Sequence, residues 1–218
     1  MANSGLVFRK RWSRYHMLEA EVLGRRAFGI NRNSGLVKLR YRADSFDLLL
    51  TNGDFVAQYN PDNSISPEMN SLSTLLLKNN QMKIYRSRFT SLNFTKRYSA
   101  RFFFKSLMEY AERSPMENTS DYYWINFLNR DFQPNNPTNS EYTQVGFATH
   151  KSFITQFQVG YRPFLSQSYR ANTRLTDWGS SPLLLAKYRA GWKDVGGSST
   201  DFNQVELSYL HNIEVNPW

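Results

Sequence analysis

Basic side chains at every second position are the residues of this 218-residue chain best suited to chemistry. Lys38, Arg40 and Arg42 alternate with apolar residues between positions 36 and 43. A spacing of two sends successive side chains of a β-strand to opposite faces. The pattern therefore predicts a strand with one cationic face, and grouped cations can bind phosphate or carboxylate groups.

Other alternating segments extend this cationic face. The candidate binding residues are Lys38, Arg40, Arg42, Arg101, Lys105, Lys187 and Arg189. One interpretation is an anion-selective lumen or a contact with lipopolysaccharide phosphates. The other, which we favour, is a lumen of paired charges with counter-ions Glu19, Glu21, Glu109 and Glu206. If the sheet is soluble, the same row becomes a nucleic-acid face.

A catalytic acid/base pair would need two converging carboxylates with different pKa values. The acidic residues closest in sequence are Glu109, Glu112, Glu117 and Asp121. Alternation sends Glu109 inward, whereas the other three are expected in a proline-containing loop. We therefore predict that these residues shape the loop and do not form a catalytic pair.

The nearest nucleophile and base are Ser152 and His150, which an alternating segment would place on one face. No Gly-x-Ser-x-Gly motif accompanies them, and residues two apart on a strand contact each other only loosely. The chain has no Cys, and its three His are far apart in sequence. We predict no catalytic residue, no metal site and no cofactor, and hence no enzyme.

The overall composition favours a phosphate-rich or membrane partner. Lys and Arg number 27 against 18 Asp and Glu, a formal charge of +9. Tyr, Phe and Trp number 13, 16 and 5, an abundance expected where aromatic girdles lie at two membrane interfaces. No apolar run reaches the roughly 20 residues of a transmembrane helix.

Alternating segments of about ten residues, the length of a tilted membrane-crossing strand, recur along the chain. They cover residues 18–25, 36–43, 46–51, 84–94, 102–110, 153–161, 184–192 and 205–209. The links at 44–45 and 97–99 are short, whereas those at 57–82 and 114–140 are long. Outer-membrane barrels have short turns on one side and long loops on the other.

One short helix is expected in the first long loop. Ser66 is a candidate N-cap, followed by Pro67 at the first helical position and Glu68 in the first turn. Leucines follow at helical spacing, and residues 78–80 close the helix. We expect it to pack on the rim or inside the mouth of a barrel.

Together these patterns predict an all-β fold. We expect an antiparallel up-and-down transmembrane β-barrel, or a large segment of one, with about eight to ten strands.

The long loops add a resemblance. The segments that carry it are residues 58–67, 72–80, 82–85, 109–122, 132–137, 183–192 and 201–208, with Glu-Tyr-Ala-Glu-Arg-Ser-Pro at 109–115 the most specific. Over roughly residues 6–216, their order and spacing resemble the barrel region of a Bacteroidota outer-membrane family of unassigned function. Members of that family place a carboxypeptidase-regulatory-like domain before the barrel and resemble relatives of TonB-dependent receptors. The resemblance implies a single barrel domain over 1–218, incomplete at both ends.

The resulting hypothesis is a protein of the bacterial outer membrane without catalysis, in a structural, transport or envelope-complex accessory role. Its expected partners are outer-membrane lipid and lipopolysaccharide, with other envelope proteins or chains completing the barrel. The alternative is a soluble, basic, β-rich nucleic-acid-binding protein, such as a ribonucleoprotein or capsid component. Nucleic acid is an expected partner only under that alternative.

Overall fold

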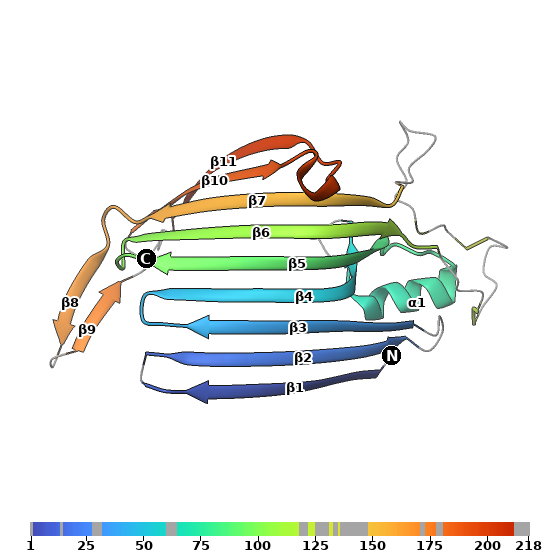
Figure 1. Cartoon of the computed structure of the whole chain (residues 1–218), viewed down its shortest axis with the longest axis horizontal. Coiled ribbons are helices and arrows are strands. Elements are labelled where there is room, and N and C mark those ends of the chain that lie inside the picture. The colour runs from blue at the N-terminus through green and yellow to red at the C-terminus, as the bar shows by residue number, and fades with distance from the viewer. Residues whose placement is uncertain are drawn as a thin grey trace, which may run out of the picture.

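One antiparallel sheet dominates the molecule, as seen in a computed structural model (Figure 1). The structure describes residues 2–13, 15–27, 32–59, 65–117, 122–124, 131–132, 135, 148–170, 173–177 and 181–211. The strands are β1 (Ala2–Arg11), β2 (Met17–Ala27), β3 (Arg32–Arg42), β4 (Phe46–Gln58), β5 (Ile84–Arg97), β6 (Phe102–Pro115), β7 (His150–Tyr161), β8 (Ser166–Arg170), β9 (Thr173–Asp177), β10 (Leu183–Gly191) and β11 (Phe202–Leu210). The helix is α1 (Pro67–Leu77), and a short 3-10 turn, η2 (Val195–Gly197), precedes β11.

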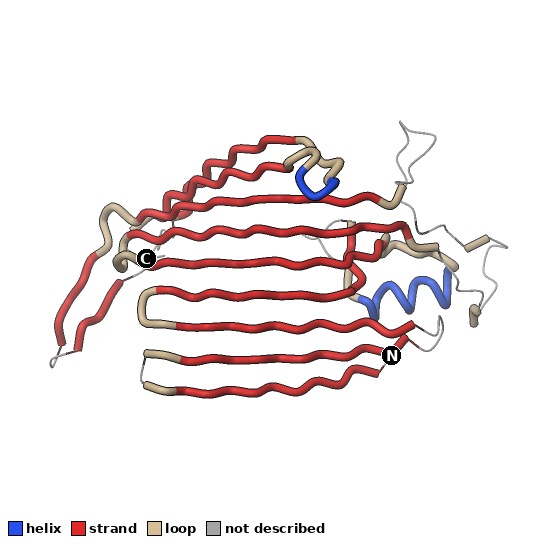
Figure 2. The backbone as a smooth tube through the Cα atoms, in the orientation of Figure 1, coloured by secondary structure: helices blue, strands red, loops and turns tan. Residues whose placement is uncertain are grey.

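The strand order follows the chain. Nine strands form one sheet in the order β1-β2-β3-β4-β5-β6-β7-β10-β11, and β8 pairs only with β9 in a separate hairpin (Figure 2). Every neighbouring pair in the large sheet is antiparallel. The prediction of an all-β, up-and-down fold is therefore confirmed. The sheet is open, because β1 and β11 each pair on one side only within the described residues.

The links between strands that were predicted to be short are short in the structure. Between β3 and β4, Ala43 donates its backbone N–H to the Phe46 carbonyl oxygen at 2.9 Å, closing a tight turn. A second short link joins β5 to β6 at the same end of the sheet (Figure 1). The links that follow β4 and β6 leave from the opposite end. The separation is incomplete, because the long link between β7 and β10, which carries β8 and β9, leaves from the short-turn end.

Residues paired across an antiparallel ladder point to the same face of the sheet, so the register divides the side chains into two sets. One set, here called the apolar face, includes a row that crosses all nine strands: Phe8, Ala20, Leu39, Leu50, Leu92, Met108, Thr155, Ala190 and Asn203. The opposite set, here called the polar face, includes the row Arg11, Met17, Arg42, Asp47, Thr95, Lys105, Gln158, Lys187 and Glu206.

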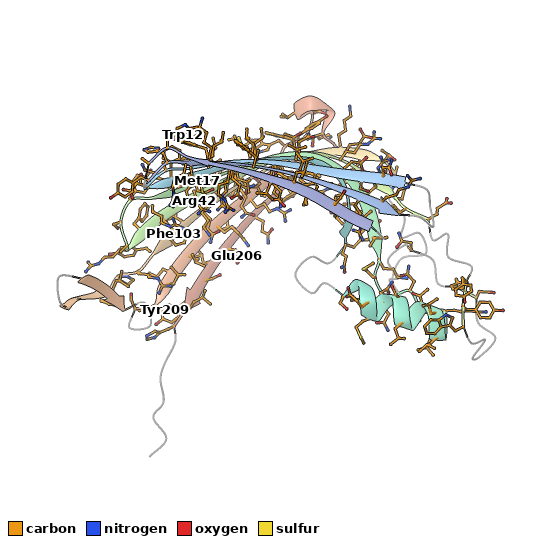
Figure 3. The ribbon with its side chains drawn as sticks, turned by 90° about the horizontal axis from the view of Figure 1, so that it is seen from below. Trp12, Met17, Arg42, Phe103, Glu206 and Tyr209 are labelled. Atoms are coloured by element: carbon orange, nitrogen blue, oxygen red, sulfur yellow. The ribbon has the colours of Figure 1, made fainter. Side chains whose placement is uncertain are left out.

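The sheet bends into an arch (Figure 3). The side chains of Arg42, Phe103 and Glu206 lie on its concave side, whereas Trp12 lies on the convex side (Figure 3). The polar face is therefore the concave face of the sheet, and the apolar face is the convex one.

The apolar face is open to the surroundings. Many large side chains on it are exposed, from 36% for Tyr188 to 79% for Leu6. The buried hydrophobic side chains of the described part are few: Ala111, Ile154 and Leu165, and Ala190 within the apolar face itself. A soluble monomer rarely exposes an apolar surface that crosses a whole sheet. An exposed apolar surface of this extent is typical of faces that bind a partner or a membrane.

The predicted helix forms at the long-loop end. The Ser66 side chain accepts a hydrogen bond from the Met69 backbone N–H at 3.2 Å, and Lys78 ends the helix in the left-handed conformation at φ 52°. α1 lies beyond the end of the arch on its concave side (Figure 3). No helix of the described residues is long and apolar enough to span a membrane.

Two glycines of the polar face leave room for aromatic rings. A Cβ atom added at Gly160 would lie 2.2 Å from ring carbons of Phe103, on the neighbouring strand β6. A Cβ atom added at Gly191 would lie 2.6 Å from the ring of Phe202 on β11. Each ring thus occupies the space beside a glycine of the adjacent strand, which a larger residue would fill.

This packing predicts that Gly160→Ala destabilises the fold by about 1–3 kcal/mol, because the Phe103 ring must leave its place. A matched control is Gly35→Ala, where the nearest atom to an added Cβ is the Leu23 carbonyl oxygen at 3.8 Å. The control should be neutral or slightly stabilising. Urea titration of both variants measures the difference, and equal midpoints would contradict the packing described.

Candidate functional site

The predicted cationic residues occupy the polar face. Lys38, Arg40, Arg42, Lys105, Lys187 and Arg189 project from β3, β6 and β10 on that face, and Arg101 lies in the link between β5 and β6. The cross-strand register, and not proximity in sequence, brings them together. They do not form one uniform row, because their partners differ between the two halves of the sheet.

Over β1 to β4, four cations pair with three carboxylates. Asp47 contacts Arg40 at 2.7 Å and Arg42 at 3.2 Å. Its side chain is only 17% exposed. In the same half, Lys38 pairs with Glu21 at 3.0 Å, and Glu19 with Arg9 at 2.6 Å. These ion pairs reduce the positive charge of this half of the polar face.

The counter-ions differ in part from those proposed from the sequence. Glu21 and Glu206 pair with Lys38 and Lys187, two of the candidate cations. Glu19 and Glu109 instead pair with cations outside the candidate set, Arg9 and Arg113. Sequence reasoning missed Asp47 as the shared counter-ion. The sequence did contain a signal for this pairing, because a tight turn at 43–45 places residue 42 opposite residue 47 on the next strand.

Over β6, β7 and β10, two cations lie on aromatic rings. The Lys105 ammonium is 5.2 Å from the centre of the Phe103 ring, and the Arg189 guanidinium carbon is 5.5 Å from that of Phe202. No carboxylate of the described residues pairs with either. Arg101 donates to the Leu165 carbonyl oxygen at 3.4 Å. The rings are those that lie over Gly160 and Gly191.

Amide side chains lie between these two cations. Gln158 is paired in register with both Lys105 and Lys187, and Gln156 with Arg189. Both amides are half-buried. None of the side-chain hydrogen bonds among the residues that the structure describes involves Gln156 or Gln158. This part of the polar face therefore presents cations and amides with unused hydrogen-bonding capacity.

The acidic residues considered for catalysis do not converge. Glu109 lies on the polar face, where it pairs with Arg113 at 3.2 Å. Glu112 lies on the opposite face, because it comes three positions after Glu109 along β6 and successive side chains of a strand alternate between the faces. Glu117 follows the strand, and Asp121 lies outside the described residues.

His150 and Ser152 have separate partners on β7. The Ser152 hydroxyl is buried and donates to the Ala111 carbonyl oxygen at 3.4 Å. His150 Nδ1 lies 3.1 Å from the Ala148 carbonyl oxygen. Across the described ranges, no group of three His, Cys, Asp or Glu side chains could hold a metal ion.

Polar and aromatic residues border the apolar face. At its long-loop end, Asp54 forms ion pairs with Arg86 and with Arg88, the latter at 3.3 Å. Nearby, the Tyr110 hydroxyl donates to the Gly196 carbonyl oxygen at 2.9 Å, and Trp192 Nε1 donates to Thr155 Oγ1 at 2.8 Å. Sequence reasoning missed the Asp54 pairs because their partners lie on a different strand.

Three of the five tryptophans fall in the described residues. Trp12 and Trp192 follow directly on the ends of β1 and β10, as an interfacial position requires, and Trp124 lies in a loop. All three are at least 44% exposed. Trp178 and Trp218 lie outside the described residues.

Replacing Asp47 should lower the free energy of unfolding more than replacing Glu206, the carboxylate of an ion pair at the sheet edge. Asp47→Asn removes one partner from two arginines, and we expect a loss of about 1 kcal/mol that shrinks at high salt. Glu206→Gln, at the sheet edge, should have a smaller effect. Urea titration at two salt concentrations compares them, and equal losses would contradict the enclosed Asp47 pair.

A family model described as "Family of unknown function (DUF5686) C-terminal domain" matches residues 1–218. No curated protein and no solved structure gives a significant match. The match covers the sheet, its long loops and the polar face described above. The chain belongs to the DUF5686 C-terminal domain family, whose function is unknown.

Proposed function

We propose that this domain is part of the wall of a β-barrel in the bacterial outer membrane. The observation that carries the proposal is the exposed apolar face, which crosses all nine strands of the sheet. In a transmembrane barrel, the residues that face lipid alternate with residues that face a polar interior. The register of this sheet produces that division of side chains.

The height of the apolar band supports a membrane position. On β7, side chains of the apolar face run from Phe153 to Tyr161, interrupted only by Thr155. A rise of about 3.4 Å per residue makes this segment roughly 27 Å long along the strand. At a tilt of about 40° it would span roughly 21 Å, near the height of about 25 Å of the apolar band of outer-membrane barrels.

The borders of the band also fit two membrane interfaces. At the short-turn end, Tyr161 and Tyr209 lie on the apolar face, and Lys96 donates to Ser45 Oγ at 2.9 Å. At the long-loop end, Tyr110 and Trp192 occupy the corresponding position. Aromatic and long cationic side chains favour the boundary between lipid and water.

The open edges limit how such a wall closes. Eight antiparallel steps separate β1 from β11, so these two strands run in the same direction. If β1 and β11 met directly, they would form a parallel pair. A closed wall in which every pair is antiparallel therefore needs an odd number of further strands inserted between β11 and β1. The β8–β9 hairpin supplies two strands and cannot meet this condition. We infer that strands beyond the described sheet complete the wall.

We propose that the wall serves a structural, transport or envelope-complex accessory role without catalysis. Its apolar face contacts outer-membrane lipid and lipopolysaccharide, and its edges pair with strands of the completed barrel. The nucleic-acid alternative uses the polar face but leaves the apolar face without a partner. The exposed apolar surface therefore favours lipid.

Heat-modifiable migration tests the membrane wall directly. The protein is extracted from membranes in detergent and run on an SDS gel with and without boiling. A folded barrel should migrate differently before and after heating. Recovery in the soluble fraction without any shift, together with salt-sensitive nucleic-acid binding, would overturn the proposal in favour of the alternative.

Two adjacent residues on β6 give a matched test of which face contacts lipid. Met108 lies on the apolar face and is 43% exposed, whereas Leu107 lies half-buried on the polar face. In lipid, Met108→Arg should cost about 2–4 kcal/mol, and Leu107→Arg should cost less. In a soluble sheet the order reverses, because the half-buried position is then the sensitive one. Urea titration of the folded protein in lipid vesicles decides between these orders.

A further inference from the structure

The centre of the polar face carries a group of unsatisfied donors. This donor patch consists of Lys105, Gln156, Gln158 and Arg189, contributed by β6, β7 and β10. The remaining cations of the polar face on β3 and β10 each pair with a carboxylate: Lys38, Arg40, Arg42 and Lys187. Each of these four cations has a carboxylate beside it, whereas no carboxylate of the described residues pairs with Lys105 or Arg189.

The two cations of the donor patch are held in place before any ligand arrives. Phe103 lies over Gly160, and its ring supports the Lys105 ammonium at 5.2 Å. Phe202 lies over Gly191, and its ring supports Arg189 at 5.5 Å. A ring attracts a cation without cancelling its charge, so both cations keep their capacity to bind an anion.

The two supports lie at opposite ends of the patch. Phe103 is opposite Gly160 and Phe202 is opposite Gly191, which itself pairs with Ile154. Residues 154 and 160 of β7 are roughly 20 Å apart, at about 3.4 Å per residue. Lys105 and Arg189 thus lean in opposite directions along β7, and the two glutamine amides lie between them.

We propose that the donor patch binds a ligand with several anionic groups, phosphates or carboxylates, extended along β7. Lys105 and Arg189 project from strands on opposite sides of β7, so an extended polyanion can contact one cation at each end, whereas a single small anion offers fewer charges to share between them. The amide N–H groups of Gln156 and Gln158 then donate to oxygens between the charges. This inference rests on the proposed function, because it assigns the polar face to the interior of the barrel.

Binding to the folded protein in detergent tests the patch. Linear polyphosphate and oligo-glutamate are the two polyanions, and orthophosphate is the small-anion control, all titrated calorimetrically at low salt. At least one polyanion should bind more tightly than orthophosphate, and the preferred one distinguishes phosphate from carboxylate recognition. Added salt should weaken binding.

Variants locate the site. Lys105→Gln and Arg189→Gln should each weaken polyanion binding about fivefold, the effect of one charge contact in water. Arg189→Lys keeps the charge and should retain most of the affinity. The matched control is Lys38→Gln, which removes a cation from the same face at a position already paired with Glu21. It should leave the affinity unchanged.

The outcomes separate the two proposals. Absence of a heat-dependent gel shift overturns the membrane wall itself, before any titration. With the shift present, the donor patch is overturned if neither polyanion binds more tightly than orthophosphate. It is also overturned if Lys38→Gln weakens binding as much as Arg189→Gln.

Discussion

Backbone hydrogen bonds fix the register of nine strands, and this register decides to which face of the sheet each side chain points. A shift of one residue in any strand would send its apolar side chains to the polar face. Because each pair keeps the same alternation, one continuous apolar surface forms on the convex side. Tertiary burial contributes little to this order, since few apolar side chains in the described part are fully buried.

The same register organises the charges. Over the first four strands it places Asp47 between two arginines and Glu21 beside Lys38, which gives each of these cations a carboxylate partner. Over the later strands it places glycines opposite phenylalanines, and the rings then hold Lys105 and Arg189. A sheet that faces lipid on one side can thus keep an ordered polar surface on the other.

Strict alternation made much of this fold predictable from the sequence, including the hairpin link at 44–45 and the helix capped by Ser66. β1 was missed because Leu6, Val7 and Phe8 are consecutive and hide the period of two. Short, polar β8 and β9 gave no apolar signal. The rings beside Lys105 and Arg189 were not predictable, because their positions depend on which glycine lies opposite which phenylalanine on the neighbouring strand.

We propose that the convex face contacts lipid and the concave face contacts water. The chain has no Cys, so single cysteines can be placed at each position of β10 without interference. In vesicles, a membrane-impermeant thiol reagent should label Lys187→Cys and Arg189→Cys and spare Ala186→Cys and Tyr188→Cys. A lipid-phase quencher should show the opposite pattern. Uniform labelling of all four positions would contradict the account.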